Sequence, residues 1–155
     1  MPFNGSPSTD TVQRAVKTVT FTGGAGAGAV GSVAVFTVTG RVLVHAIAAF
    51  CTTDLTEALA TASISLGTTN QTTRFIANPT GGPIAIDANE WWTGTTPTVG
   101  SIDITGGSAG ATDQQSVLVS EAIILTIGTQ AVNGGVLDIY CLWEPLSANG
   151  SLVAA

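Results

Sequence analysis

The longest run of apolar and β-branched residues extends from Val33 to Phe50 and predicts two β-strands. Such side chains are stiff about χ1 and pack well on a pleated sheet, and the run lacks the spacing of a helical face. Gly40 and Arg41 interrupt it in the middle, where a glycine indicates a bend or bulge rather than a two-residue hairpin. The second strand is apolar on both faces, so we expect it at the centre of a sandwich or at a buried interface.

Shorter segments with strand patterns occupy much of the remaining chain. Residues 60–67 alternate between apolar and small polar side chains, and residues 136–144 alternate so that the odd-numbered ones share an apolar face. Further short strands are expected at residues 16–22, 73–77, 84–86, 100–106, 117–119 and 122–127. Asp54 and Glu57 indicate a turn or a single helical turn. Eight to ten short strands without a βαβ unit predict an all-β, antiparallel β-sandwich that is jelly-roll-like.

A length of 155 residues predicts one folded domain, which we place at residues 33–146. Residues 1–32 are expected to form an extended N-terminal arm with a first strand and a Gly/Ala-rich turn, and residues 147–155 a C-terminal tail. Phe3 and Pro7 are predicted to contact a partner, because proline limits the conformations of the arm and Phe3 has almost nothing to pack on within it. The Gly/Ala-rich turn lacks the following helix and acidic residue of a dinucleotide loop.

The composition predicts a surface that is largely covered. Hydrophobic residues make up 45% of the chain and charged residues only 9%, against about 25% in typical globular proteins. We expect copies of the chain or a partner to cover much of the neutral polar exterior, the alternative being a soluble monomer coated with Thr and Ser. A net charge of -6 with four scattered cations argues against nucleic acid and anionic membranes as partners. Because neither a signal peptide nor an eighteen-residue apolar run is apparent, we expect synthesis in the cytoplasm.

The few chemically reactive residues give no catalytic pattern. Cys51 and Cys141 are predicted to be buried free thiols. The single histidine, His45, lies in the most apolar strand, which favours a core or interface role over a catalytic base or a dyad with Cys51. The acidic residues are dispersed, so we expect no metal, no cofactor and no enzyme activity, although a glycosidase-type carboxylate pair stays open.

Two sets of apolar residues are predicted to make contacts. Val42, Val44 and Ile47 are assigned to the subunit contact of a homotrimer, because a sandwich can use only one face of their strand internally. Trp91 and Trp92 must point to opposite faces if the chain is extended there. At least one of them is therefore a candidate exposed aromatic contact at an interface or a loop.

Three short segments resemble one family of proteins. They are Thr39 to His45 (TGRVLVH), Asn78-Pro79-Thr80, and Leu142 to Leu146 (LWEPL) followed by the residues up to Ser151. In these segments the chain resembles small β-rich head proteins encoded beside the major capsid protein in tailed bacteriophages, many of which are decoration (cement) proteins. The resemblance implies a jelly-roll-like trimer on the outer capsid surface. Neither the Gly/Ala-rich turn nor the tryptophan pair has a counterpart in this pattern.

The resemblance leads to a first functional hypothesis and leaves two others open. The first is a structural virion protein, made in the host cytoplasm, that binds the outer surface of an assembled phage capsid and bridges subunits of the major capsid protein, with Phe3 and Pro7 as candidate capsid contacts. The second is a receptor- or carbohydrate-binding spike head, in which Trp91 or Trp92 would stack on sugar rings. The third is a hydrolase that uses a carboxylate pair.

Overall fold

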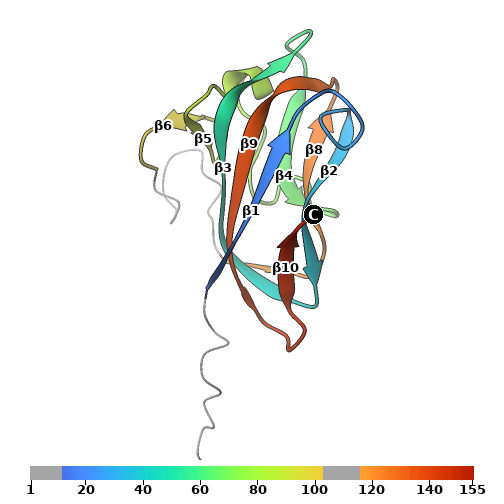
Figure 1. Cartoon of the computed structure of the whole chain (residues 1–155), viewed down its shortest axis with the longest axis vertical. Coiled ribbons are helices and arrows are strands. Elements are labelled where there is room, and N and C mark those ends of the chain that lie inside the picture. The colour runs from blue at the N-terminus through green and yellow to red at the C-terminus, as the bar shows by residue number, and fades with distance from the viewer. Residues whose placement is uncertain (1–11, 103–115) are drawn as a thin grey trace, which may run out of the picture.

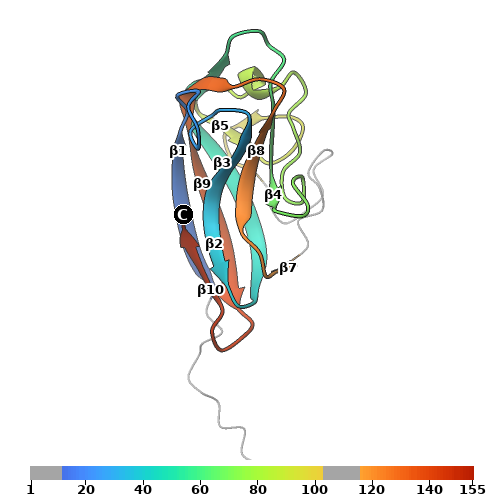
Figure 2. The ribbon, with the colours of Figure 1, turned by 90° about the vertical axis from the view of Figure 1, so that its right-hand side faces the viewer.

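The computed structural model describes residues 12–102 and 116–155 and is an all-β sandwich of two antiparallel sheets, as predicted (Figures 1 and 2). The larger sheet has the strand order β1-β9-β3-β5-β6, with β7 also paired to β3, and the smaller has the order β10-β2-β8-β4. The elements are β1 (Gln13–Thr20), β2 (Gly31–Thr39), β3 (Val42–Glu57), β4 (Ser63–Thr68), the 3-10 turn η1 (Pro83–Ala85), β5 (Glu90–Trp92), β6 (Thr98–Val99), β7 (Val117–Val119), β8 (Ile123–Gly128), β9 (Val132–Pro145) and β10 (Ser151–Ala154). The hydrophobic core fills the space between the sheets.

The long apolar run forms two strands that belong to different sheets. β2 lies in the four-stranded sheet and β3 in the six-stranded sheet, so the chain crosses between the layers at Gly40 and Arg41. Gly40 has a φ of +65°, and a Cβ there would lie 2.6 Å from side-chain oxygens of Ser147 and Asn149. The predicted bend is therefore confirmed, and a glycine is required at the crossing both for its backbone conformation and for space. β3 is central, as expected, because it pairs with β9 on one side and with β5 and β7 on the other.

A β-bulge in β3 decides which of its side chains face the core. In the pairing with β9 the register shifts between Val44 and Ala46, so His45 is an extra residue. Strict alternation would place Ile47 on the same face as His45. The bulge instead turns Ile47 inward and leaves His45 and Ala46 on the outer face.

The prediction that Val42, Val44 and Ile47 form a subunit contact is wrong for these side chains. Their exposed fractions are 0%, 2% and 1%, because all three pack in the core between the two sheets. A side chain that is already buried within its own chain has no surface left for a second subunit. Any contact that β3 makes with another molecule must use its other face.

Both sheets include strands from regions that the sequence analysis places outside the folded domain. β1 lies within the predicted arm but pairs with β9 along its whole length, and β10 lies within the predicted tail but pairs with β2. The reason is that the backbone groups of a strand find their hydrogen-bonding partners in a sheet edge. Phe3 and Pro7 lie outside the described residues, so their predicted contacts are not seen.

Three local predictions are corrected. Residues 84–86 contribute to the turn η1 rather than to a strand, because Pro83 opens a 3-10 turn behind Gly82, whose φ is +79°. Residues 73–77 form a loop that touches β4 through one bridge, Leu66 to Ile76. Residues 54–57 continue β3 instead of forming a turn. Of the strand predicted at residues 100–106, only residues 100–102 are described, and they are not in a strand.

Cys51 and Cys141 are buried free thiols, as predicted. Burial raises the pKa of Cys51 to about 11 and that of Cys141 to about 12. Because the thiolate is the reactive form, we expect iodoacetamide to label neither thiol of the native protein between pH 7 and 9. In 6 M guanidinium chloride without reductant both should be labelled, and faster at pH 9 than at pH 7. Mass spectrometry counts the adducts, and an unfolded protein without adducts would contradict the free-thiol assignment.

Candidate binding face on the six-stranded sheet

The outer faces of the two sheets have different chemistry. On the four-stranded sheet, most positions that alternate with core residues carry small side chains, such as Ser32, Ala34, Thr37, Ser65, Gly67 and Thr126, and Ile124 and Val153 are larger apolar exceptions. On the six-stranded sheet, seven of the corresponding positions carry large apolar or aromatic side chains, namely Val16, Leu43, Phe50, Trp91, Leu118, Tyr140 and Leu142, and others carry polar ones such as Thr18, His45, Asp138 and Glu144. These seven residues are half-buried or exposed. We call this second surface the apolar face.

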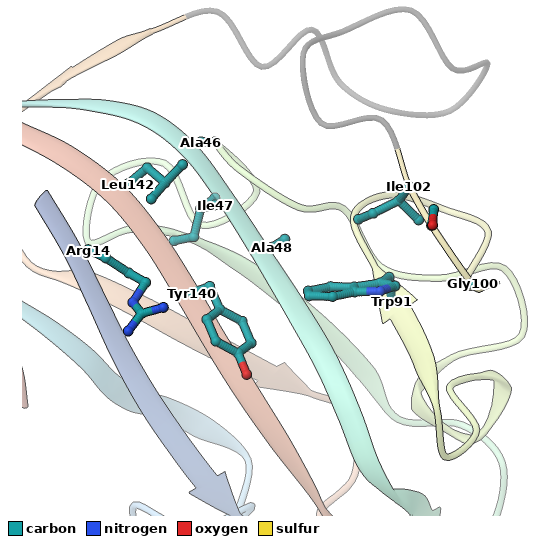
Figure 3. Close-up of a pocket in the computed structure, with 10 residues that line it drawn as sticks. Arg14, Ala46, Ile47, Ala48, Trp91, Gly100, Ile102, Tyr140 and Leu142 are labelled. Atoms are coloured by element: carbon teal, nitrogen blue, oxygen red, sulfur yellow. The ribbon is translucent and has the colours of Figure 1, made fainter. Parts of the chain in front are cut away.

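A groove of about 480 Å³ runs across the apolar face (Figure 3). Its floor includes Ala46 and Ala48 of β3, and Tyr140 and Leu142 of β9 lie beside them. Trp91 of β5 and residues 100–102, which follow β6, also line it. The hollow exists because two consecutive outward positions of β3 carry methyl groups while the neighbouring strands carry large side chains. Its size falls within the range of pockets that bind ligands or side chains of a partner.

Trp91 forms the aromatic side of the groove. Its ring centroid lies 4.9 Å from that of Phe50, its cross-strand partner, and 5.8 Å from that of Tyr140. The interplanar angles are 55° and 51°, tilted arrangements that aromatic pairs favour. These contacts hold the Trp91 indole in place while leaving it partly exposed to a partner.

Trp92 points the opposite way, which confirms that the two tryptophans use opposite faces. Its side chain is fully buried, and its Nε1 donates a hydrogen bond to the backbone oxygen of Ala77 at 3.1 Å. The prediction that Trp92 is an exposed contact is therefore wrong, because its indole is part of the core beneath β5. Trp91 keeps the role that the sequence assigned to at least one of the pair.

Arg14 brings charge to the groove. It lies on β1 opposite Leu142, and it is the one charged side chain among the described residues that line the groove. The remaining lining is apolar apart from the Tyr140 phenol, the Ser101 hydroxyl and the backbone. The groove can therefore bury an apolar group while offering a guanidinium to an anion or a carbonyl oxygen.

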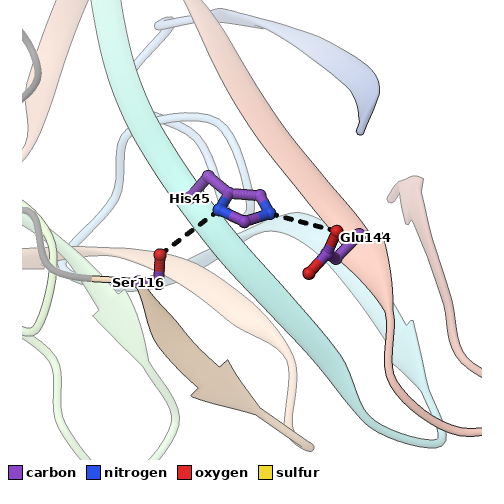
Figure 4. Close-up of polar contacts among 3 residues, drawn as sticks. All are labelled: His45, Ser116 and Glu144. Atoms are coloured by element: carbon purple, nitrogen blue, oxygen red, sulfur yellow. Dashed lines mark hydrogen bonds and ion pairs between the residues drawn. The ribbon is translucent and has the colours of Figure 1, made fainter. Parts of the chain in front are cut away.

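A row of polar side chains crosses the apolar face beside the groove (Figure 4). His45 Nδ1 lies 3.2 Å from Ser116 Oγ, and His45 Nε2 lies 3.4 Å from Glu144 Oε2. The order resembles a hydrolase triad, but the hydroxyl faces Nδ1 and the carboxylate faces Nε2, the reverse of a serine protease. His45 lies on β3, Glu144 on the neighbouring β9, and Ser116 immediately before β7 on the other side of β3, so sheet pairing alone accounts for the row. Cys51 faces the core on the other side of β3 and forms no dyad with His45.

Sequence reasoning singled out the pair Trp91 and Trp92 but missed most of the groove. The alternation of β9 assigns residues 137, 139, 141 and 143 to the core, and the same alternation places Tyr140 and Leu142 on the opposite face. That signal was available in the sequence. The position of Arg14 was not, because it depends on how β1 pairs with β9.

Comparisons with known proteins give no relative for this chain: no protein-family model, no curated protein and no solved structure matches it. Within residues 12–102 and 116–155, no three His, Cys, Asp or Glu side chains gather closely enough to hold a metal ion. In the same part of the chain, no helix is long and apolar enough to cross a membrane.

Proposed function

We propose that the protein is a non-enzymatic structural component of a phage particle. It binds the outer surface of an assembled capsid as a homotrimer and stabilises the shell by bridging subunits of the major capsid protein. The observation that carries the proposal is the difference between the two outer faces, since a large apolar face on one sheet is suited to permanent cover by protein. The resemblance of three segments to phage head proteins supplies the identity of the partner.

The chemistry of the apolar face suits a long-lived contact. Burying apolar surface contributes about 25 cal/mol per Å² and, unlike a contact between charges, is not screened by salt. Leu118 of β7 is 73% exposed and is the most accessible large side chain of this face. In a trimer, three such faces attached to one shell would convert weak single contacts into tight retention through effective concentration.

Replacing Leu118 by Asp is expected to lower retention on capsids by at least about tenfold, because a carboxylate would be desolvated in the contact. Stability should change by less than about 0.5 kcal/mol, as is usual for exposed positions. Leu59→Asp is the matched control: Leu59 is also 73% exposed but lies in the connection between β3 and β4, outside the apolar face.

Each purified variant is added to capsids that lack the protein, and the amount that stays bound to the capsids is quantified after a wash in high salt. Equal retention of the two variants would contradict attachment through the apolar face. Wild-type protein that does not bind capsids at all would contradict the proposed function itself.

A carbohydrate-binding spike head is the second candidate, and one observation favours it. Trp91 and Tyr140 present aromatic surface beside Arg14, a combination that can stack on a sugar ring and hydrogen-bond its hydroxyl groups. A glycan array separates the two functions. Binding that is lost in Trp91→Ala but kept in Leu118→Asp would favour the carbohydrate function over capsid attachment.

A further inference from the structure

We propose that the groove on the apolar face binds the N-terminal segment, residues 1–11, of a second copy of this chain, with Phe3 inserted beside Trp91. Both partners are copies of the same protein, so the inference goes beyond capsid attachment and does not depend on it. Three features of the chain support it: the lining of the groove, the composition of the segment, and the point at which the segment joins β1.

The lining of the groove suits one aromatic side chain. Ala46 and Ala48 provide a flat apolar floor, and the rings of Trp91 and Tyr140 provide edges and faces against which another ring can pack. Phe3 is the only aromatic residue in the parts of the chain that the structure does not describe. A phenyl ring placed there would bury its apolar surface over the nearly covered alanine floor and against Trp91 and Tyr140, which are otherwise partly open to water.

The composition of the segment suits an extended ligand. Pro2 and Pro7 fix their own φ angles and disfavour the helical region for Met1 and Ser6, so less conformational entropy is lost when the segment binds. Asp10 is its only charged side chain, and Arg14 is the only one among the described lining residues of the groove. Their opposite charges favour the pairing of segment and groove.

The point at which the segment joins β1 favours a second copy over the same chain. Arg14 lies opposite Leu142 and Val16 opposite Tyr140, so β1 runs along the groove from its Arg14 side. Figure 1 shows that β1 enters the sheet at the end away from β5 and β6. An extended continuation before Gln13 therefore leads away from Trp91. Eleven extended residues span about 36 Å, enough to reach the apolar face of a neighbouring molecule.

Cross-linking between isotopically distinct chains tests the proposal in the full-length protein. Phe3 is replaced by photoreactive p-benzoylphenylalanine, and chains grown on ¹⁴N and on ¹⁵N are mixed, irradiated and digested. The expected products join position 3 of one isotope to groove peptides of the other, at residues 46–48, 91 or 140–142. Products within one isotope only, products outside the groove, or no products would overturn the proposal.

Sedimentation equilibrium gives an independent readout. Phe3→Ala should weaken self-association at least about tenfold, and Phe3→Leu should weaken it less, because leucine keeps most of the buried apolar surface. Ala48→Leu, which fills the groove, should weaken self-association to a similar extent. The double variant with Phe3→Ala and Ala48→Leu should associate no more weakly than either single variant, because both substitutions remove the same contact.

Circular dichroism shows whether Ala48→Leu is folded. If it is not folded, the Phe3→Ala variant and the cross-links decide the question, since Phe3 precedes the first described strand in the sequence. An unchanged dissociation constant for Phe3→Ala would overturn the proposal. If capsids are added and position 3 is then cross-linked to a capsid subunit instead of to groove peptides, the segment binds the capsid, and this would also overturn the proposal.

Discussion

Replacing Trp92 by alanine is expected to lower the free energy of unfolding by about 3–5 kcal/mol, the usual cost of removing a fully buried tryptophan. The indole is 0% exposed and fills the core beneath β5, a strand of only three residues. The substitution also removes the hydrogen bond from Trp92 Nε1 to the Ala77 oxygen. Guanidinium chloride denaturation, followed by circular dichroism at one fixed protein concentration, measures the loss.

Two variants show whether the loss arises from burial. Trp92→Phe keeps most of the apolar volume but not the donor, so it should lie between the wild type and Trp92→Ala. Trp91→Ala removes a residue of the same type on the outer face and should cost about 1–2 kcal/mol, the worth of its two aromatic contacts. Equal losses for Trp91→Ala and Trp92→Ala would contradict the orientation of the two side chains.

Replacing Gly28 by alanine is expected to destabilise the protein by about 2–5 kcal/mol, from backbone strain and overpacking together. Gly28 has a φ of +116°, and a Cβ there would lie 2.1 Å from the backbone oxygen of Val132. The Val132 N–H also donates a hydrogen bond to the Gly28 oxygen at 2.8 Å. The Gly/Ala-rich turn is thus joined to the start of β9 through backbone atoms, which cannot move aside for a methyl group.

Gly26 provides the matched control in the same turn. Its φ is +69°, but nothing lies within 4 Å of the position that a Cβ would occupy. Gly26→Ala should therefore cost about 1–2 kcal/mol, from the left-handed backbone alone. The same denaturation measurement compares the two variants. A loss for Gly28→Ala no larger than that for Gly26→Ala would show that the turn is not held tightly against β9.

The groove could not be predicted in full from the sequence, because it depends on the pairing of strands that are distant in the chain. Its residues come from β1, β3, β5 and β9 and from residues 100–102, so the groove exists only once these parts are adjacent. The sequence predicted only that one of Trp91 and Trp92 faces outward, because two adjacent tryptophans cannot both face the core of an extended segment. Which of the two is buried depends on the pairing of Trp92 with Ala49, a core residue of β3.

The sequence by itself determined the fold class, the central position of β3, the bend at Gly40 and the burial of both cysteines. These properties follow from local patterns, namely β-branched runs, alternation of period two, and glycines between strands. The tertiary structure alone decided that Ile47 faces the core together with Val42 and Val44, because a bulge at His45, which the pairing with β9 sets, shifts the alternation after Val44. It also placed β1 and β10 at sheet edges, since a strand with a weak pattern of its own is recruited by an edge that needs hydrogen-bonding partners.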